Sequence, residues 1–273
     1  MTAPSSNAVH DEGMRLRRKE SVPEVSRRQL SAVAASRAIA SKGCLLVRGF
    51  SSPHQVGLLK QTISDAFASY DANQLLPFVG HDGTPPRDFI RETGGVLAAD
   101  VPSAIPTLTE AFEEVGVRAL ATEFFGEAPF LLTSKCTLRW VETKKTLENT
   151  PVTAIDFHQD GAFMGADVKT LNIWLALSEC GENAPGLDLV PRRLSGVITH
   201  DDALTDWTVT DPVARDCAKP VSPLFHPGDA LLFDHLMLHR TGLRPGMTED
   251  RYAIETWLGA ASAYPPGLNA VPY

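Results

Sequence analysis

A histidine and an aspartate that could bind a metal ion lie close together in the segment IDFHQDGAFMG, residues 155–165. The segment predicts a short strand, in which successive side chains point to opposite faces. His158 and Asp160 would then point to the same side, with Gln159 on the opposite side. Gly161 would permit a sharp turn directly afterwards. An imidazole and a carboxylate held side by side are a candidate pair of metal ligands.

The His-x-Asp spacing is not specific by itself. A second such pair, His200 and Asp202, occurs in the polar stretch ITHDDALTD. That stretch predicts a loop, and we interpret its two residues as surface or capping groups. The surrounding sequence therefore has to distinguish a metal ligand from an ordinary polar residue.

A third ligand is expected in HPGDALLFDHLMLHRTG, residues 226–242, where a Pro-Gly-Asp turn and a buried strand precede two histidines. His235 or His239 could complete the site; we expect His239, with His235 orienting a neighbour or packing behind the ligands. Two imidazoles and one carboxylate leave three metal positions open, as in non-haem iron(II) sites that take a bidentate co-substrate and dioxygen. The alternative is a zinc site on both histidines, but Leu236 stands where a zincin helix carries glutamate.

The first half of the chain has helical patterns. Ser52 is a suitable N-cap with Pro53 in the first turn, and Gly43 is a suitable residue just beyond a helix end. Residues 71–103 are rich in Gly, Pro and Asp and predict a long loop. Helices are predicted over about residues 23–43, 52–70 and 105–126.

The second half consists of short β-prone segments separated by Gly, Pro and Asn/Asp clusters, which is typical of an antiparallel sandwich or barrel. We therefore predict a mainly β fold with flanking helices (α+β). A helical front over about residues 23–126 would pack on a jelly-roll core over about 127–260, within one domain spanning 23–273. Residues 1–22 are polar and patternless and are expected to be disordered.

The composition excludes several classes of protein. A net charge of −8 without a long basic tract argues against nucleic acid as a partner. No apolar run is long enough to span a membrane, and the N-terminus lacks the apolar region of a secretory signal. The four cysteines form no CxxC pair and predict reduced thiols in a cytoplasmic protein. A homo-oligomer is compatible with the sequence but not indicated by it.

Four ordered segments together resemble the phytanoyl-CoA dioxygenase (PhyH-like) family, over about residues 130–258. The resemblance implies a double-stranded β-helix (cupin-like) core that uses Fe(II), 2-oxoglutarate and O2. The segment GCLLVRGF and the helix after it are similar to the front part of the family. The four segments are HQDGAFMG, LNIWLALSECGENAPGLDLVP, HPGDALLFDHLMLHRTG and RYAIETW.

The resemblance also implies roles for individual residues. His158, Asp160 and His239 match the iron ligands. Arg251 matches the arginine that holds the distal carboxylate of 2-oxoglutarate, as a planar guanidinium can with two hydrogen bonds; Arg244 is the second choice. The remaining matches are Thr241, a hydroxyl that helps to hold the same carboxylate, and Trp174, an aromatic that lines the co-substrate pocket.

Substrate contacts are less clearly implied, because the sequence departs from the family here. In LLTSKCTLRW, Lys135, Thr137 and Arg139 share one side of a predicted strand, but the usual Lys-Pro-Pro-Gly sequel is missing. We expect Thr137 to contact the co-substrate and Arg139 the substrate. In VPRRLSG, where relatives carry Val-Pro-Gly-Ser-His, Arg192 or Arg193 could bind an anionic substrate or form a solvated basic turn.

The expected reaction is hydroxylation of an unactivated C–H bond in a small, anionic metabolite, with succinate and CO2 as co-products. Related halogenases carry Gly or Ala in place of Asp160, so we do not expect halogenation. Desaturation, epoxidation and cyclisation use the same oxidising chemistry and stay open. So does a non-catalytic cupin-like protein that binds a metabolite.

Overall fold

A computed structural model describes residues 21–75, 87–149, 156–198, 208–209, 211–263 and 267–273. Nearly all of the N-terminal segment predicted to be disordered lies outside these residues, as does the His200–Asp202 pair. Among the described helices, none combines the length and apolar character that a membrane crossing needs.

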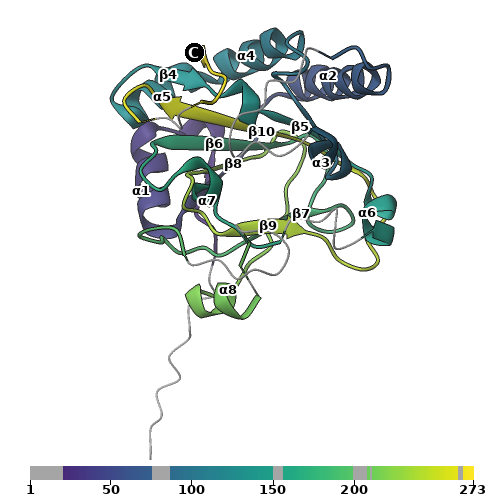
Figure 1. Ribbon diagram of the computed structural model, residues 1–273. Coiled ribbons are helices and arrows are strands. Elements are labelled where there is room, and N and C mark those ends of the chain that lie inside the picture. The colour runs from purple at the N-terminus through teal and green to yellow at the C-terminus, as the bar shows by residue number, and fades with distance from the viewer. Residues whose placement is uncertain (1–20, 76–86, 150–155, 199–207, 210, 264–266) are drawn as a thin grey trace, which may run out of the picture.

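The helices of the first half form the outer layer of the molecule (Figure 1). Ser52 accepts a hydrogen bond from the amide of Gln55 and Pro53 lies in the first turn, so the second helix begins where the sequence predicts. The α-helices are α1 Ala32–Lys42, α2 Pro53–Asp71, α3 Arg87–Glu92, α4 Ala104–Val115, α5 Val117–Phe125, α6 Thr143–Asn149, α7 Gly161–Met164 and α8 Asp211–Cys217, and the 3-10 helices are η1 Arg27–Gln29 and η2 Thr133–Lys135.

The strands form a major and a minor sheet. In the major sheet the order is β1-β2-β8-β6-β10-β4-β11, with β5 also paired to β10 and β3 to β5; β7 and β9 form the minor sheet. The pairings between these described strands are antiparallel except that of β1 with β2, which is parallel. The strands are β1 Glu24–Ser26, β2 Cys44–Arg48, β3 Gly95–Leu97, β4 Pro129–Leu131, β5 Thr137–Val141, β6 Thr170–Ala176, β7 Gly186–Leu189, β8 Ala230–Phe233, β9 His239–Gly242, β10 Arg251–Ala260 and β11 Val271–Pro272.

Alternation along the central strands separates two apolar clusters. In β6, Leu171, Ile173 and Leu175 pack with the helices of the outer layer. Trp174 and Ala176 belong instead to the cluster between the two sheets. Figure 1 shows the minor sheet below the major sheet, with α7 between them. The predicted mainly β, jelly-roll class with flanking helices is confirmed, and the inner face of β6, β8 and β10 is the wall available for a site.

Two helix predictions are wrong in part. Residues 23–43 do not form one helix, because Ser26 and Leu30 have extended backbones and β1 pairs with β2. Only α1 is helical, and it ends at the left-handed Gly43. The helix predicted over 105–126 is broken by Gly116, which has φ +81° and separates α4 from α5.

Two further predictions missed short elements. The loop predicted over 71–103 contains α3 and β3, and β3 adds to the edge of β5. The strand predicted in LLTSKCTLRW, residues 131–140, is interrupted by η2, which separates β4 from β5. Because β4 and β5 both pair antiparallel with β10, η2 interrupts a line of strand that continues along β10 in the same direction.

Candidate metal centre

Two histidines are brought together by a direct backbone pairing. The amide of His158 donates to the carbonyl of His239 at 2.9 Å, and the reverse bond is 3.0 Å long. Their imidazole rings therefore lie side by side, with centroids 4.3 Å apart. His239 begins β9, whereas His158 forms an isolated bridge and no continuous strand, contrary to the prediction.

Asp160 reaches the same point through a helical turn. Its backbone has φ −63° and ψ −22° at the start of α7, so strand alternation does not direct its carboxylate. Gly161 follows where the chain passes close to His235: a Cβ there would lie 3.1 Å from that residue's carbonyl oxygen. The predicted glycine turn is therefore a close backbone approach as well.

The three side chains offer ligand atoms that all lie within 4.8 Å of one another. The Nε2 atoms of His158 and His239 are each 3.8 Å from an oxygen of Asp160. The two Nδ1 atoms donate to the carbonyls of Asp156 and Met237, at 2.7 and 3.0 Å. A carbonyl only accepts, so Nδ1 carries the proton and each Nε2 presents a lone pair towards the carboxylate.

The electrostatics of this cluster also fit a cation. Asp160 is buried, and its Oδ2 has no hydrogen-bond partner among the described residues. Burial raises the pKa of Asp160 to about 6. Burial, and then the neighbouring His239, hold the pKa of His158 well below its usual value. A neutral imidazole and an unsatisfied buried carboxylate are what a divalent metal ion would stabilise.

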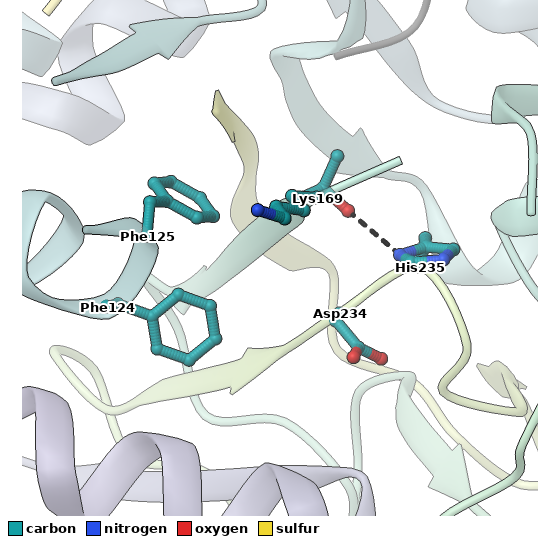
Figure 2. Close-up of a pocket in the computed structure, with 6 residues that line it drawn as sticks. Phe124, Phe125, Lys169, Asp234 and His235 are labelled. Carbon is teal, nitrogen blue, oxygen red and sulfur yellow. Dashed lines mark hydrogen bonds between the residues drawn. The ribbon is translucent and has the colours of Figure 1, made fainter. Parts of the chain in front are cut away.

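His235 is occupied elsewhere. Its Nε2 lies 3.1 Å from the carbonyl of Ala166, and its Nδ1 lies 3.3 Å from the hydroxyl of Thr170. Both ring nitrogens are thus engaged. The ring lines a cavity of about 270 Å³ together with Phe124 and Phe125, and Figure 2 shows the positions of these side chains. His235 lines this neighbouring cavity, and none of the three converging ligand atoms belongs to it.

Arg251 is a buried cation at the start of β10. Its Nη1 donates to the carbonyl of Gly186 at 3.2 Å, and its Nε has no partner among the described residues. Burial, aided by the charge of Arg139, lowers its pKa to about 10. On the same face of the sheet, Ala253 lies opposite Ala176, and both side chains are small. A carboxylate ligand would satisfy this arrangement.

The other predicted co-substrate residues lie around the same interior. Thr241 is half-buried in β9, opposite Leu187 of β7. Trp174 is buried against Phe225, with ring centroids 4.8 Å apart. Thr137 is buried in β5 and stands opposite Glu255 of β10.

The predicted arginines have protein partners. Arg139 donates to Glu255 at 2.9 Å and to the hydroxyl of Thr93 at 3.2 Å. Arg192 is exposed and donates to the carbonyl of Cys217 at 2.6 Å. The other two are Arg193, which pairs with Asp234, and Arg244, which donates to Asp188 at 2.6 Å and to Ser222.

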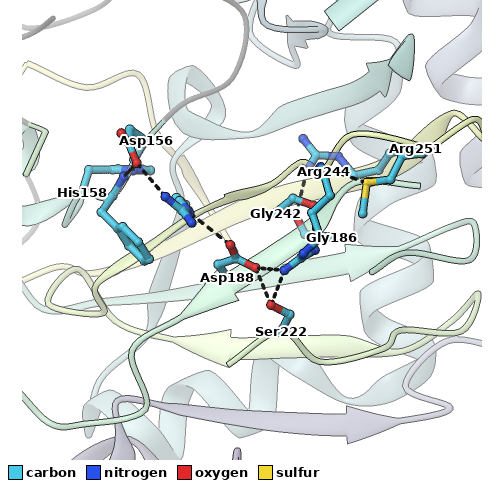
Figure 3. A network of polar contacts seen from close by, with 11 residues as sticks. Asp156, His158, Gly186, Asp188, Ser222, Gly242, Arg244 and Arg251 are labelled. Atoms are coloured by element: carbon cyan, nitrogen blue, oxygen red, sulfur yellow. Dashed lines mark hydrogen bonds and ion pairs between the residues drawn. The ribbon is translucent and has the colours of Figure 1, made fainter. Parts of the chain in front are cut away.

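Sequence reasoning missed a buried acid that supports the centre. Asp188 in β7 accepts from Arg244 and, at 3.0 Å, from Arg240. Arg240 also donates to the side-chain carboxylate of Asp156. The backbone carbonyl of Asp156 in turn accepts the hydrogen bond from Nδ1 of His158. Figure 3 shows this network running beside the minor sheet from Arg244 towards His158. The alternation of GLDL places Asp188 on the face opposite the interior residues Leu187 and Leu189, but it does not indicate the partners of the acid.

Three more polar groups lie on or beside the inner face, and two of them, Asn172 and Glu255, were not predicted. Both amide atoms of Asn172 are buried without a partner among the described residues, so the interior beside Phe233 and Trp257 is partly polar. Burial alone would raise the pKa of Glu255, but the Arg139 guanidinium outweighs it and lowers the pKa. The third group is the ammonium of Lys135, which lies 4.6 Å from the ring centroid of Phe163.

The two-sheet barrel with an open His-Asp-His centre is the architecture of a double-stranded β-helix metalloprotein. The chain matches the family described as phytanoyl-CoA dioxygenase (PhyH) over residues 39–244. It belongs to that family and is an iron(II)- and 2-oxoglutarate-dependent oxygenase. No curated protein matches the chain significantly.

Solved structures share the fold at low sequence identity. The chain is similar to the carbocyclase SnoK from nogalamycin biosynthesis, with a TM-score of 0.59, 15% identity, and coverage of 89% of this chain and 90% of that one. For the epimerase SnoN, in complex with Fe3+, alpha-ketoglutarate and nogalamycin RO, the TM-score is 0.56 and the identity 16%, with coverage of 89% of this chain and 93% of that one. For EvdO2 from Micromonospora carbonacea var. aurantiaca, the TM-score is 0.56 and the identity 18%, with coverage of 93% of this chain and 97% of that one.

Proposed function

We propose that His158, Asp160 and His239 hold iron(II). The observation that carries this assignment is the convergence of two Nε2 lone pairs and an unsatisfied, buried carboxylate oxygen. Both imidazoles are fixed from behind by backbone carbonyls, which lowers the cost of ordering them when the metal binds.

Arg251 would hold the distal carboxylate of 2-oxoglutarate, with Thr241 assisting. Its unpartnered Nε supports this role, because a buried donor without an acceptor is costly unless a ligand supplies one. Trp174 and Thr137 would line the space between the guanidinium and the metal. When bound together, iron(II), 2-oxoglutarate and dioxygen supply the oxidising power, and succinate and CO2 are released. The protein orients these groups and excludes water from them.

The reaction we propose is hydroxylation of an unactivated C–H bond in a small molecule. Asp160 supplies a third protein ligand, which supports hydroxylation over halogenation. Ring closure is the second candidate, because SnoK, which shares the fold, is a carbocyclase. The mass of the product separates them: hydroxylation adds one oxygen atom, and ring closure removes two hydrogen atoms.

The test is succinate release from 2-oxoglutarate by the iron(II)-loaded protein across a library of small metabolites. Asp160→Ala should abolish release. Asp229→Asn changes a buried aspartate that is bonded to Arg48 at 2.6 Å, and it serves as the control that should retain activity. Normal turnover by Asp160→Ala, or no iron-dependent succinate release by the unchanged protein, would refute the assignment.

A further inference from the structure

Lys135 ends η2, two residues before the start of β5, and its ammonium lies beside the metal centre. The ammonium is 4.6 Å from the ring centroid of Phe163, and Phe163 belongs to α7, three residues after Asp160. In β5, which follows, Thr137 and Arg139 alternate with Leu138 of the outer apolar cluster and therefore face the barrel interior. Burial lowers the pKa of Lys135, and the carboxylates of Asp160 and Glu255 oppose that effect.

No described carboxylate forms an ion pair with this ammonium. Glu255 is taken by Arg139, at 2.9 Å. Asp160 is 3.8 Å from each imidazole and is the acid proposed for the metal. Lys135 is therefore a half-buried cation that contacts the face of the Phe163 ring and, among the described residues, no carboxylate.

The balance of charge around the centre makes this cation informative. With iron(II) and 2-oxoglutarate bound, the metal and Arg251 carry three positive charges. Asp160 and the two carboxylates of the co-substrate carry three negative charges. Arg139 and Glu255 balance each other. The positive charge of Lys135 then has no counterpart within the site, and a desolvated charge strongly favours an anionic partner.

We propose that Lys135 receives an anionic group, a carboxylate in the first instance, of the primary substrate, and so selects for acids over neutral molecules. The inference rests on the proposed function, because it places the substrate beside the bound metal and co-substrate. The sequence predicts an anionic substrate because of three arginines. Arg139 and Arg193 are paired with acids and Arg192 is exposed, so the expectation now depends on Lys135.

The first experiment measures binding without turnover. The anaerobic protein, loaded with iron(II) and 2-oxoglutarate, is titrated with acetate and benzoate and with their neutral amides, acetamide and benzamide. The change in its visible absorption is followed. Lys135→Gln should weaken binding of the acids about tenfold to hundredfold and leave the amides unchanged, because one charge-assisted hydrogen bond is lost. Lys135→Arg should restore most of the preference.

The matched control is Lys60→Gln. Lys60 is also half-buried, and its ammonium lies 4.7 Å from the ring centroid of Tyr252, but it belongs to α2 on the outer face of the major sheet. Its replacement should leave acid and amide binding unchanged. Equal binding of acids by the unchanged protein and Lys135→Gln would overturn the proposal, since the anions would then bind the metal or another cation.

The second experiment separates the substrate from the co-substrate. Lys135→Gln should leave the dissociation constant of 2-oxoglutarate within about twofold of that of the unchanged protein. If the variant instead lost as much affinity for 2-oxoglutarate as it loses for the acids, Lys135 would be assigned to the co-substrate. In the succinate-release screen, stimulating compounds should be acids whose amides are inactive. Failure of the proposed function has its own signature, which is no absorption change when 2-oxoglutarate is added to the iron(II)-loaded protein.

Discussion

Replacing Arg251 by Met should separate the stability of the ligand-free protein from its affinity for 2-oxoglutarate. Burial lowers the pKa of this guanidinium from 12.5 to about 10. That shift corresponds to about 3 kcal/mol of unfavourable free energy for the buried charge. Among the described residues the guanidinium has one hydrogen bond, to the carbonyl of Gly186 at 3.2 Å, and this bond returns about 1 kcal/mol. Arg251→Met should therefore raise the free energy of unfolding of the ligand-free protein by about 2 kcal/mol.

The same substitution should weaken 2-oxoglutarate binding. A carboxylate paired with a buried guanidinium gains charge-assisted hydrogen bonds, and their loss costs about 3 kcal/mol, or more than a hundredfold in the dissociation constant. Calorimetric titration of the anaerobic iron(II)-loaded protein measures this constant, and thermal unfolding of the metal-free protein measures the stability.

Arg244→Met is the matched control, because Arg244 was the alternative arginine. Its guanidinium is bound to Asp188 at 2.6 Å and to Ser222. Its replacement should leave the affinity for 2-oxoglutarate nearly unchanged and lower the stability. A reversal of these two results, with Arg244→Met losing the co-substrate and Arg251→Met binding it normally, would refute the reasoning.

Three further predictions concern the supports of the site. Asp188→Asn should lower the free energy of unfolding by about 2–3 kcal/mol and weaken iron(II) binding about tenfold in a metal titration. The reason is that Arg240, which contacts Asp188 and Asp156, would no longer be held in place behind His158. The control Asp229→Asn should lower the stability and leave iron(II) binding unchanged. Iron(II) affinity should fall about tenfold per pH unit below about pH 6, where Asp160 takes up a proton, and should be nearly flat above it; a fall already complete at pH 7 would contradict the pKa. Gly116→Ala should cost about 1 kcal/mol in denaturant unfolding, since φ is +81° and no atom lies near the new Cβ, while leaving iron binding unchanged.

The sequence predicted the convergence of His158 and Asp160, but for an incorrect local reason. Strand alternation would have aligned them, whereas His158 sits in an isolated bridge and Asp160 in the first turn of α7. The turn at Asp160, and not strand alternation, brings its carboxylate to within 3.8 Å of the His158 imidazole. The choice between His235 and His239 depends on backbone pairing with a segment far away in the chain, which no local pattern records.

The buried charges were the least predictable part of the site. Alternation placed Lys135, Thr137 and Arg139 on one side of a strand. The pairing of Arg139 with Glu255 depends on the register between β5 and β10, across 116 residues of sequence. The break at Gly116 was missed for a related reason: the apolar spacing continues through it, and a glycine inside a helical pattern does not by itself reveal a positive φ.

Anaerobic titration of the protein with iron(II) in the presence of 2-oxoglutarate tests the metal centre most directly. We predict a weak visible charge-transfer band that grows to one equivalent of iron, is absent in Asp160→Ala and His239→Ala, and persists in His235→Asn. A band of full intensity in either ligand variant, or its loss only when His235 is replaced, would contradict the assignment of the three ligands.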